Sequence, residues 1–380
     1  MTEAPPLAVY VHWPYCARIC PYCDFNVVRD RGQMEQAALA EAIVRDLMGQ
    51  AALIGPRRLT SVFFGGGTPS LMRPEWAGRI IEAARRLWPS AEPAEVTLEA
   101  NPTDAEAGRF RALAQAGITR LSLGVQSLDD AALKFLGRNH SAAEARRAAA
   151  LAGSIFPRLS LDFIYALPGQ TLDHWRASLR EAIALGPEHL SPYQLTIEAG
   201  TPFERAVRRK VIEPVAEDAS ADLYELTQEM LGAAGFEAYE VSNHARRREA
   251  RSVHNMAYWR GWDYLGVGPG AHGRLAAETG RLALEGETKV ADYIASVEET
   301  GIGCRAPETL KPRQYALERL LLGLRGHEGV PLADIAPLNI KPEKINDMVL
   351  GGLLVRAGGR LMATARGRCL LDHVTSNLIR

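Results

Sequence analysis

Short apolar runs alternate with longer amphipathic segments through the first half of the chain. The apolar positions of the longer segments, which are rich in Ala, Leu, Arg and Glu, repeat with a helical period. The predicted strands are 7–13, 61–67, 95–101, 120–126, 158–168 and 189–197, and the predicted helices are 34–54, 74–87, 104–116, 142–152 and 172–185. Strands that alternate with helices predict a parallel sheet. We expect an α/β fold in which six βα units form a partial TIM-like barrel.

The pattern becomes less regular after residue 200 and changes again after Pro307. A helix at 219–234, a strand-like run at 236–241 and a glycine-rich stretch at 261–273 come first. Helices at 314–324 and 342–354 and a hairpin-like segment at 354–367 follow. Helices that end in a two-stranded ribbon are typical of winged-helix domains. We therefore predict a large domain at 1–304 and a smaller winged-helix-like domain at 305–380.

Composition excludes several classes of protein. Apolar residues make up 47% and charged residues 23% of the chain, which is ordinary globular usage and not disorder. The sequence contains no apolar run long enough to span a bilayer and no secretion signal, so we expect a cytoplasmic protein. The net charge of −1 favours no nucleic-acid partner. Residues 305–380 are locally basic, with twelve Lys and Arg against seven Asp and Glu, which keeps nucleic-acid binding by the predicted wing as a minor alternative.

Three of the five cysteines, Cys16, Cys20 and Cys23, fall within eight residues directly after the first predicted strand. Three thiolates in a CxxxCxxC loop can hold three irons of a [4Fe-4S] cluster and leave the fourth iron open for a ligand. A structural zinc site would need a fourth protein ligand, which the local sequence lacks. Cys304 and Cys369 stand alone, and we expect them to be buried structural residues.

This cysteine spacing after the first strand of a βα series resembles the radical S-adenosylmethionine superfamily. The segment Gly65 to Pro69, GGGTP, resembles the glycine-rich segment of that superfamily, which approaches the methionine end of the nucleotide. A tight turn between strand and helix would explain these glycines equally well. The resemblance implies that S-adenosylmethionine chelates the open iron and that one electron from the cluster cleaves it to a 5′-deoxyadenosyl radical.

The resemblance narrows to the oxygen-independent coproporphyrinogen III oxidase family over nearly the whole chain. It implies that S-adenosylmethionine is bound by Tyr10, Tyr22, Gly66, Gly67, Thr68, Glu99, Gln126, Arg138 and Asp162. Carboxylates can hold an ammonium group or ribose hydroxyls, and Gln and Arg can hold hydroxyls and a carboxylate. Each residue alone could equally be a satisfied polar group at the end of a strand, but their joint match favours the binding site.

Two features separate the oxidase from a second branch of the family. The oxidase has a fourth cysteine two positions after the third and a long arm before the first, whereas this sequence has Phe25 there and 15 residues before Cys16. The run His254 to Trp259, HNMAYW, resembles the HNxxYW element of the HemW branch of heme chaperones. This resemblance implies heme as a ligand, and the candidate heme contacts are His254, Tyr258 and Trp259.

His244 and His272 are secondary heme-ligand candidates, whereas His12 is expected to serve local packing or hydrogen bonding. A polar and aromatic core or surface element is the alternative interpretation of HNMAYW. We expect a heme chaperone that hands heme to an acceptor hemoprotein, including a respiratory, membrane-associated one, and that needs an electron donor for its cluster. Catalytic turnover is not expected, and the chain would be a monomer or dimer. The enzyme alternative is oxidative decarboxylation of coproporphyrinogen III.

Overall fold

A large, mostly parallel sheet organises the computed structural model, which describes residues 4–30, 32–278 and 280–379. Its central strands are β1 (Pro6–Trp13), β4 (Arg58–Gly66), β5 (Glu95–Ala100), β6 (Arg120–Gln126), β7 (Arg158–Tyr165) and β8 (His189–Gln194). These strands follow one another in chain order, and each pairs in parallel with the next. All six predicted strands are therefore confirmed, and the fold is α/β with βα units.

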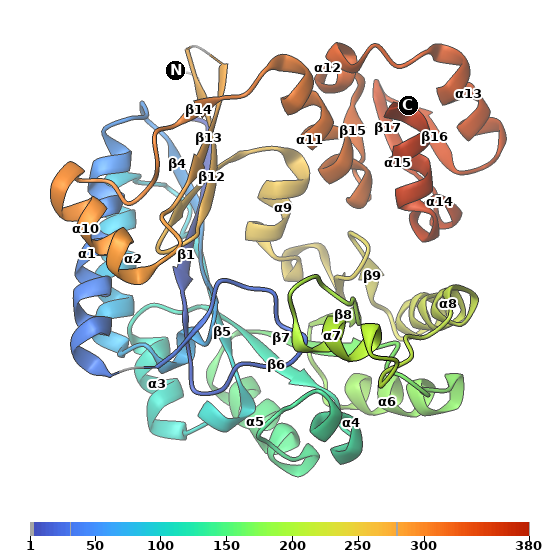
Figure 1. Ribbon diagram of the computed structural model, residues 1–380, viewed down its shortest axis with the longest axis horizontal. Coiled ribbons are helices and arrows are strands. Elements are labelled where there is room, and N and C mark those ends of the chain that lie inside the picture. Colours follow the sequence, from blue (N-terminus) through green and yellow to red (C-terminus); the bar gives the residue numbers. More distant parts are fainter. Residues whose placement is uncertain (1–3, 31, 279, 380) are drawn as a thin grey trace.

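Helices connect these strands and cover one face of the sheet (Figure 1). They are α1 (Gln33–Ala51), α2 (Pro74–Leu87), α3 (Ala107–Gln115), α5 (Ala142–Ile155), α6 (Leu172–Ala184) and α8 (Glu217–Ala233). Two short helices, α4 (Asp130–Phe135) and α7 (Pro202–Arg208), instead pack with Tyr22 of the cysteine loop in a separate apolar cluster. The main hydrophobic core forms between the helices and the sheet, where strand residues such as Val9, Leu98 and Leu161 are buried. The opposite face of the strands is left for polar side chains.

The sheet extends beyond the predicted strands at both edges. β11 (Asp263–Val267) pairs in parallel with β1 from the other side, and β12 (His272–Ala277), β13 (Gly280–Glu285) and β14 (Glu308–Thr309) continue the sheet antiparallel. At the far edge lie β10 (His244–Ala245) and β9 (Glu237–Ala238). The strand expected at 236–241 is only two residues long, because the Glu240 side chain accepts a hydrogen bond from the Ser242 amide in a turn.

The C-terminal part has a hydrophobic core of its own (Figure 1). Its elements are α11 (Pro312–Arg325), β15 (Val330–Pro331), α12 (Leu332–Ile335), η4 (Ala336–Leu338), α13 (Pro342–Leu350), β16 (Leu354–Ala357), β17 (Arg360–Ala363), α14 (Ala365–Cys369) and α15 (Leu371–Ile379). The predicted helices and hairpin are present, and β15 adds a third strand in the order β15-β17-β16. A boundary at 304/305 stays a proposal, because β14 still belongs to the main sheet.

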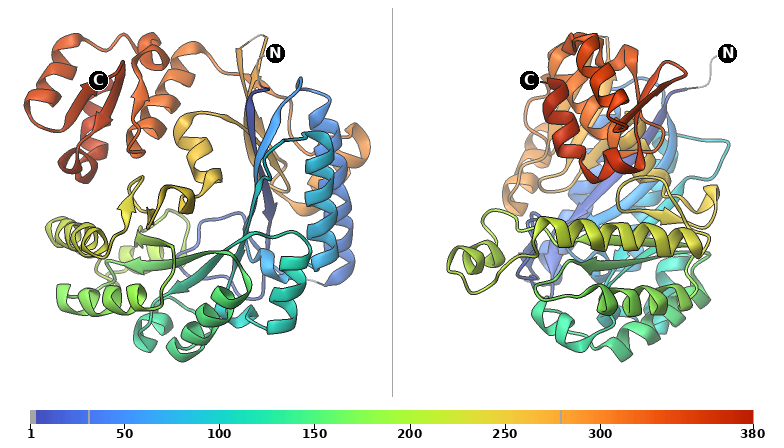
Figure 2. Two further views of the ribbon diagram at one scale, coloured as in Figure 1. Left: turned by 180° about the vertical axis from the view of Figure 1, so that it is seen from behind. Right: turned by 90° about the vertical axis from the view of Figure 1, so that its right-hand side faces the viewer.

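One short helix, α9 (Val253–Arg260), lies between the sheet and the C-terminal part (Figures 1 and 2). Arg260 at its end forms two hydrogen-bonded contacts to Glu328, at 2.8 and 2.5 Å. Arg274 of β12 binds Glu318 of α11 in the same two-pronged way. These bridges join the two parts of the chain. Within the described ranges, no helix is long and apolar enough to cross a membrane.

Candidate cofactor site

Alternation along the strands separates an apolar outer face from a polar inner face. On β1, Val9 and Val11 pack into the main core, whereas Tyr10 and His12 point to the other side, where the Tyr10 hydroxyl lies 3.1 Å from His12 Nδ1. β7 repeats this pattern, because Leu161 belongs to the core and Ser160 donates a hydrogen bond to Asp162 at 3.1 Å. Side chains separated by two residues share a face of a strand. The inner face is therefore a row of hydrogen-bonding groups.

The loop that carries the three cysteines lies at the C-terminal end of β1, between β2 (Tyr15–Cys16) and β3 (Val28–Arg29). His12 Nε2 donates to the Asn26 carbonyl at 2.8 Å, which confirms the expected local role of this histidine. The Asn26 side chain donates to the carbonyls of Pro269 at 2.9 Å and Thr288 at 2.8 Å. Hydrogen bonds to residues more than 240 positions later in the sequence thus hold the loop in place.

The cysteine thiols face polar partners from neighbouring strands. Thr68 donates a hydrogen bond to Cys16 Sγ at 3.5 Å, and Arg138 Nη1 donates to Cys20 Sγ at 3.4 Å. Cys23 closes a turn through its amide, which donates to the Cys20 carbonyl at 3.2 Å. Burial raises the pKa of Cys16, and it raises the pKa of Cys23 to about 11. Burial therefore favours the protonated thiols of Cys16 and Cys23, and bound iron would supply the charge that ionises them.

The three sulfurs suit a cluster better than a single ion. The thiols of Cys16 and Cys20 both raise the pKa of Cys23, so all three lie within electrostatic reach of one another. Among the described residues, however, no group of three His, Cys, Asp or Glu side chains could hold one metal ion. Thiolates of a [4Fe-4S] cluster each bind a different iron and need not converge on one point. The arrangement therefore fits three ligands of such a cluster.

The glycine-rich segment after β4 brings two chain segments close together. Gly66 has a φ of 105°, and a Cβ added there would lie 2.4 Å from the His12 ring. A Cβ on Gly67 would lie 2.7 Å from the Pro14 carbonyl. The amides of Gly67 and Thr68 donate to carbonyls of the cysteine segment at 2.8 and 2.9 Å. These glycines therefore allow the glycine-rich turn to hold the cysteine loop against the sheet.

Asn101, a polar residue at the end of the third predicted strand that was not among the predicted nucleotide ligands, connects Thr68 and Arg138, the two partners of the cysteine thiols. Its side-chain amide donates to Thr68 Oγ1 at 3.1 Å, and its Oδ1 accepts from Arg138 Nη2. Arg138 also donates to the Gly124 carbonyl at 3.2 Å, yet its buried Nε has no hydrogen-bond partner in the described part of the chain. Tyr22 lies next to Arg138 and Cys20 and packs on the ring of Phe203. A free guanidinium N–H beside the thiols is available for a ligand carboxylate.

Two carboxylates face each other across the inner face. Glu99 Oε2 accepts a hydrogen bond from the Gly66 amide at 3.2 Å, and Asp162 Oδ2 accepts one from Ser122 at 2.8 Å. Burial, with a smaller effect of Asp162, raises the pKa of Glu99 to about 8, and burial also raises the pKa of Asp162. Glu99 has no ion pair with a Lys or Arg side chain in the described part of the chain, whereas Asp162 is held by serine hydroxyls and by a weaker effect of Arg120, which lowers its pKa. A cationic ligand would supply the charge that they lack.

Gln126 ends β6 in the left-handed region, with a φ of 64°, at a shift in the register between β6 and β7. Its side chain lies close to Gly124, where an added Cβ would be 2.9 Å from Gln126 Nε2. All nine predicted nucleotide-binding residues thus lie on β1, β4, β5, β6 and β7 or on the loops that follow them. In a parallel sheet, ligands bind at this carboxyl edge.

The HNMAYW element forms α9, in which His254 and Tyr258 contact each other while Trp259 points away from them. His254 is 1% exposed, and its ring nitrogens lie 3.1 Å from Ser61 Oγ and 2.9 Å from the Tyr258 hydroxyl. Burial lowers the pKa of His254 to about 3, so the ring is neutral. Trp259 points to the C-terminal part, where the Arg325 guanidinium lies 5.4 Å from its ring centre. The element thus joins the inner face to the C-terminal part.

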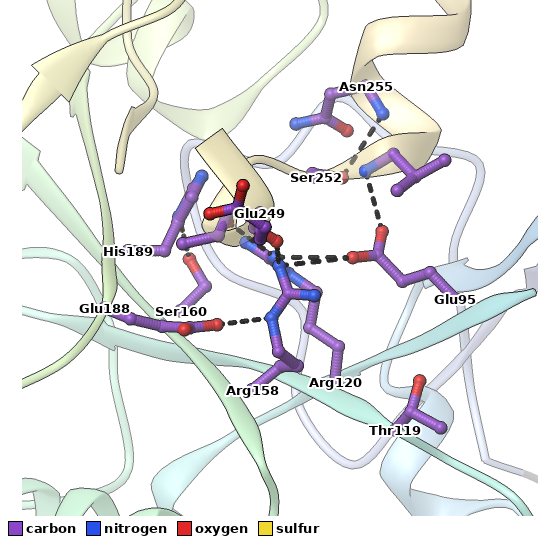
Figure 3. A network of polar contacts seen from close by, with 12 residues as sticks. Glu95, Thr119, Arg120, Arg158, Ser160, Glu188, His189, Glu249, Ser252 and Asn255 are labelled. Carbon is purple, nitrogen blue, oxygen red and sulfur yellow. Dashed lines mark hydrogen bonds and ion pairs between the residues drawn. The ribbon is translucent and has the colours of Figure 1, made fainter. Parts of the chain in front are cut away.

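Opposite the cysteine edge, charged residues tie the first residues of β5, β6 and β7 to the segment that leads into α9 (Figure 3). Glu95 lies 3.5 Å from Arg120 and 3.8 Å from Arg158, and it accepts a hydrogen bond from the Val253 amide at 2.8 Å. Arg120 also donates to the Ala250 carbonyl at 2.9 Å. Glu95 and Arg120 are buried, so this end of the sheet is closed by compensated charges.

The two isolated cysteines differ from each other. Cys304 is buried, as expected, and its backbone forms an isolated antiparallel β-bridge with Gly286 beside the main sheet. Cys369 is exposed on α14, so the expectation that it would be buried is wrong. Its thiol donates to the Ala365 carbonyl one helical turn earlier at 3.5 Å, because α14 is a short surface helix.

Comparisons with known proteins agree with this geometry. Residues 10–182 match the model of the radical SAM superfamily. The chain is 36% identical over 392 residues to the zebrafish (Danio rerio) radical S-adenosyl methionine domain-containing protein 1, mitochondrial, covering 100% of this chain and 88% of that protein. It is 40% identical over 290 residues to the heme chaperone HemW of Escherichia coli, covering 76% of this chain and 75% of HemW. The chain belongs to the HemW branch of the radical SAM superfamily.

A solved structure supports the same radical SAM fold. The coproporphyrinogen III oxidase HemN of E. coli superposes with a TM-score of 0.81, covering 99% of this chain and 90% of that one, at 21% sequence identity. Membership of the superfamily implies a [4Fe-4S] cluster and S-adenosylmethionine as cofactors. The three thiols, the free N–H of Arg138 and the unpaired carboxylates Glu99 and Asp162 fit these two groups.

Proposed function

We propose that this radical SAM protein is a heme chaperone that binds heme and transfers it to an acceptor hemoprotein. The observation that carries the proposal is the 40% identity with the heme chaperone HemW of E. coli over three quarters of both chains. Relatives from Haemophilus influenzae and Bacillus subtilis, at 40% and 32% identity, carry the same name.

Within this function, Cys16, Cys20 and Cys23 hold the [4Fe-4S] cluster. When bound and reduced, the cluster supplies one electron to S-adenosylmethionine. The nucleotide is held on the inner face by Tyr10, Tyr22, Gly66, Gly67, Thr68, Glu99, Gln126, Arg138 and Asp162. Arg138 binds its carboxylate, and Glu99 compensates its positive charge.

His254, Tyr258 and Trp259 stay predicted heme contacts. Coordination of heme iron by His254 requires that this side chain give up its hydrogen bonds to Ser61 and Tyr258. The proposal further includes an electron donor for the cluster, an acceptor that can be a respiratory hemoprotein, a cytoplasmic location, a division of the chain at 304/305, and a monomeric or dimeric state. Several relatives are named as mitochondrial proteins, so the location is a point for direct measurement.

Anaerobic reconstitution followed by two parallel assays tests the function. The reconstituted protein should take up about one heme per chain and release it to an apo-hemoprotein, and it should not convert coproporphyrinogen III. Appearance of protoporphyrinogen at enzymatic rates, with reductant and S-adenosylmethionine present, would contradict the proposal and favour the oxidase. A variant in which Cys16, Cys20 and Cys23 are all Ser serves as the cluster-free control in both assays.

A further inference from the structure

Three histidines are exposed, and one of these three lies on the sheet. Of the nine histidines, which all lie in the described ranges, three are exposed: His174 on α6, His272 at the start of β12 and His373 on α15. A histidine that binds heme iron must offer a ring nitrogen without another partner. His254 and His189 have both ring nitrogens within hydrogen-bond distance of neighbouring side chains, so neither offers one.

His272 lies on the inner face of the sheet. Alternation along β12 places Leu275 in the main core and Arg274 on the opposite side. Arg274 pairs in register with Tyr264 of β11, whose ring packs edge-on against Tyr258 at 4.7 Å. Because residues two apart share a face, His272 lies on the same side as Arg274. Its imidazole makes no hydrogen bond within the described ranges, although it lies within electrostatic reach of His12 and its residue pairs with Glu285 of β13.

A glycine lets the backbone of His272 come close to the strand that borders β1. Gly266 pairs with Tyr10 of β1, and a Cβ on Gly266 would lie 2.3 Å from the His272 carbonyl oxygen, so this approach requires glycine. His272 also lies within electrostatic reach of His12 on β1, whose pKa is lowered by burial and, to a smaller extent, by His272. These two observations place His272 beside the β1 side of the predicted nucleotide site.

The same stretch of chain is attached to the cysteine loop. Asn26, three residues after Cys23, binds the Pro269 carbonyl three residues before His272. Glu99 and Asp162, whose negative charge would repel heme propionates, lie on β5 and β7, away from this side of the sheet. A flat anionic macrocycle therefore finds an accessible imidazole near the cysteine loop and at a distance from Glu99 and Asp162. The carboxylate opposite His272, that of Glu285, is compensated by Arg305 at 3.3 Å.

We propose that His272 is the axial ligand through which this protein binds heme iron, and that α9 joins the barrel to the C-terminal part through His254, which contacts Ser61, and Arg260, which binds Glu328. This assignment rests on the proposed heme-binding function. It places the cargo on β11 and β12, next to the cluster loop.

Titration of the reconstituted, cluster-containing protein with hemin tests the assignment. His272→Ala should shift the Soret band and weaken heme affinity at least about tenfold, since loss of even an outer coordination partner of a metal costs about that much. Added imidazole should restore the Soret band of this variant. His174→Ala and His373→Ala are matched controls, because both remove an exposed imidazole from a helix outside the sheet, and they should behave as the wild type.

His272→Ala with unchanged Soret position and affinity would overturn the assignment. A wild-type protein that takes up no heme would instead contradict the proposed function itself, so the two failures are distinguishable. The iron content of each variant reports whether the cluster site is intact. We expect His272→Ala to bind as much iron as the wild type, because no contact between His272 and a cysteine is present in the described ranges.

Discussion

Replacing Glu99 by Gln should change how the stability of the protein depends on pH. The folded protein raises the pKa of Glu99 from 4.5 to about 8, chiefly through burial. Since one pKa unit corresponds to about 1.4 kcal/mol, this interval corresponds to about 5 kcal/mol. Glutamine keeps the shape of the side chain but cannot ionise, so the substitution removes this titration.

The sign of the effect follows from the two pKa values. Between pH 4.5 and about 8 the folded state retains a proton that the unfolded state has already released. The stabilisation linked to this proton is complete below pH 4.5, declines as the pH rises, and is lost above pH 8. The free energy of unfolding of the wild type should therefore fall, relative to that of Glu99→Gln, by up to about 5 kcal/mol from acid to alkaline pH.

Urea unfolding of the cluster-free protein, followed by circular dichroism over this pH range, measures the difference. Glu82→Gln is the control, because Glu82 is an exposed helix residue paired with Arg86 four positions on. Curves for the wild type and Glu99→Gln that stay parallel from about pH 5 to about pH 9 would refute the argument that Glu99 is a buried carboxyl without a cationic partner. S-adenosylmethionine bound to the reconstituted protein should reduce the pH dependence of the wild type, but not that of the variant.

Three further sets of substitutions test other parts of the structure. Replacement of Cys16, Cys20 or Cys23 by Ser should abolish iron incorporation, measured by iron analysis. Replacement of Cys304 or Cys369 by Ser should leave it unchanged. Glu95→Ala should cost about 3–5 kcal/mol in chemical unfolding because it leaves Arg120 buried and unpaired, whereas the exposed Glu82→Ala should cost less than about 1 kcal/mol. Gly67→Ala should destabilise the cluster-containing protein by about 1–3 kcal/mol, because the added Cβ would collide with the cysteine segment. The control Gly232→Ala, in open space on α8, should be neutral or stabilising. Equal effects of the two substitutions would contradict the close approach of Gly67 to the cysteine segment.

The parallel sheet could be predicted because its signals are local. Strand and helix periods alternate along residues 7–197, and each strand pairs with the next one in the chain. β11 could not be found in this way, since its partner β1 lies about 250 residues earlier and its short run, Asp263–Val267, stands in a glycine-rich stretch. Pairing between remote segments leaves no periodic mark in either of them.

The sequence predicted the parts of the candidate site that depend on the spacing of residues along the chain. It did not predict the parts that depend on contacts between remote segments. Three cysteines within eight residues indicate a metal site by themselves. Asn26 and Asn101 organise the same site through two side-chain hydrogen bonds each to remote segments, and a lone asparagine in the sequence does not show which remote groups it will contact. One signal was available for the inner face: the alternation in RLSLDF, which sets Arg158, Ser160 and Asp162 on one side of β7.

The charged residues at the starts of β5, β6 and β7 have a consequence for cargo traffic. A ligand that left the inner face at that end would have to separate Glu95 from Arg120 in an environment from which water is excluded. This end of the sheet is therefore unfavourable for ligand exchange, and we expect heme and nucleotide to enter and leave at the carboxyl ends of the strands, beside the cysteine loop. Delivery of one ligand and reloading of the other would then compete for the same side of the sheet.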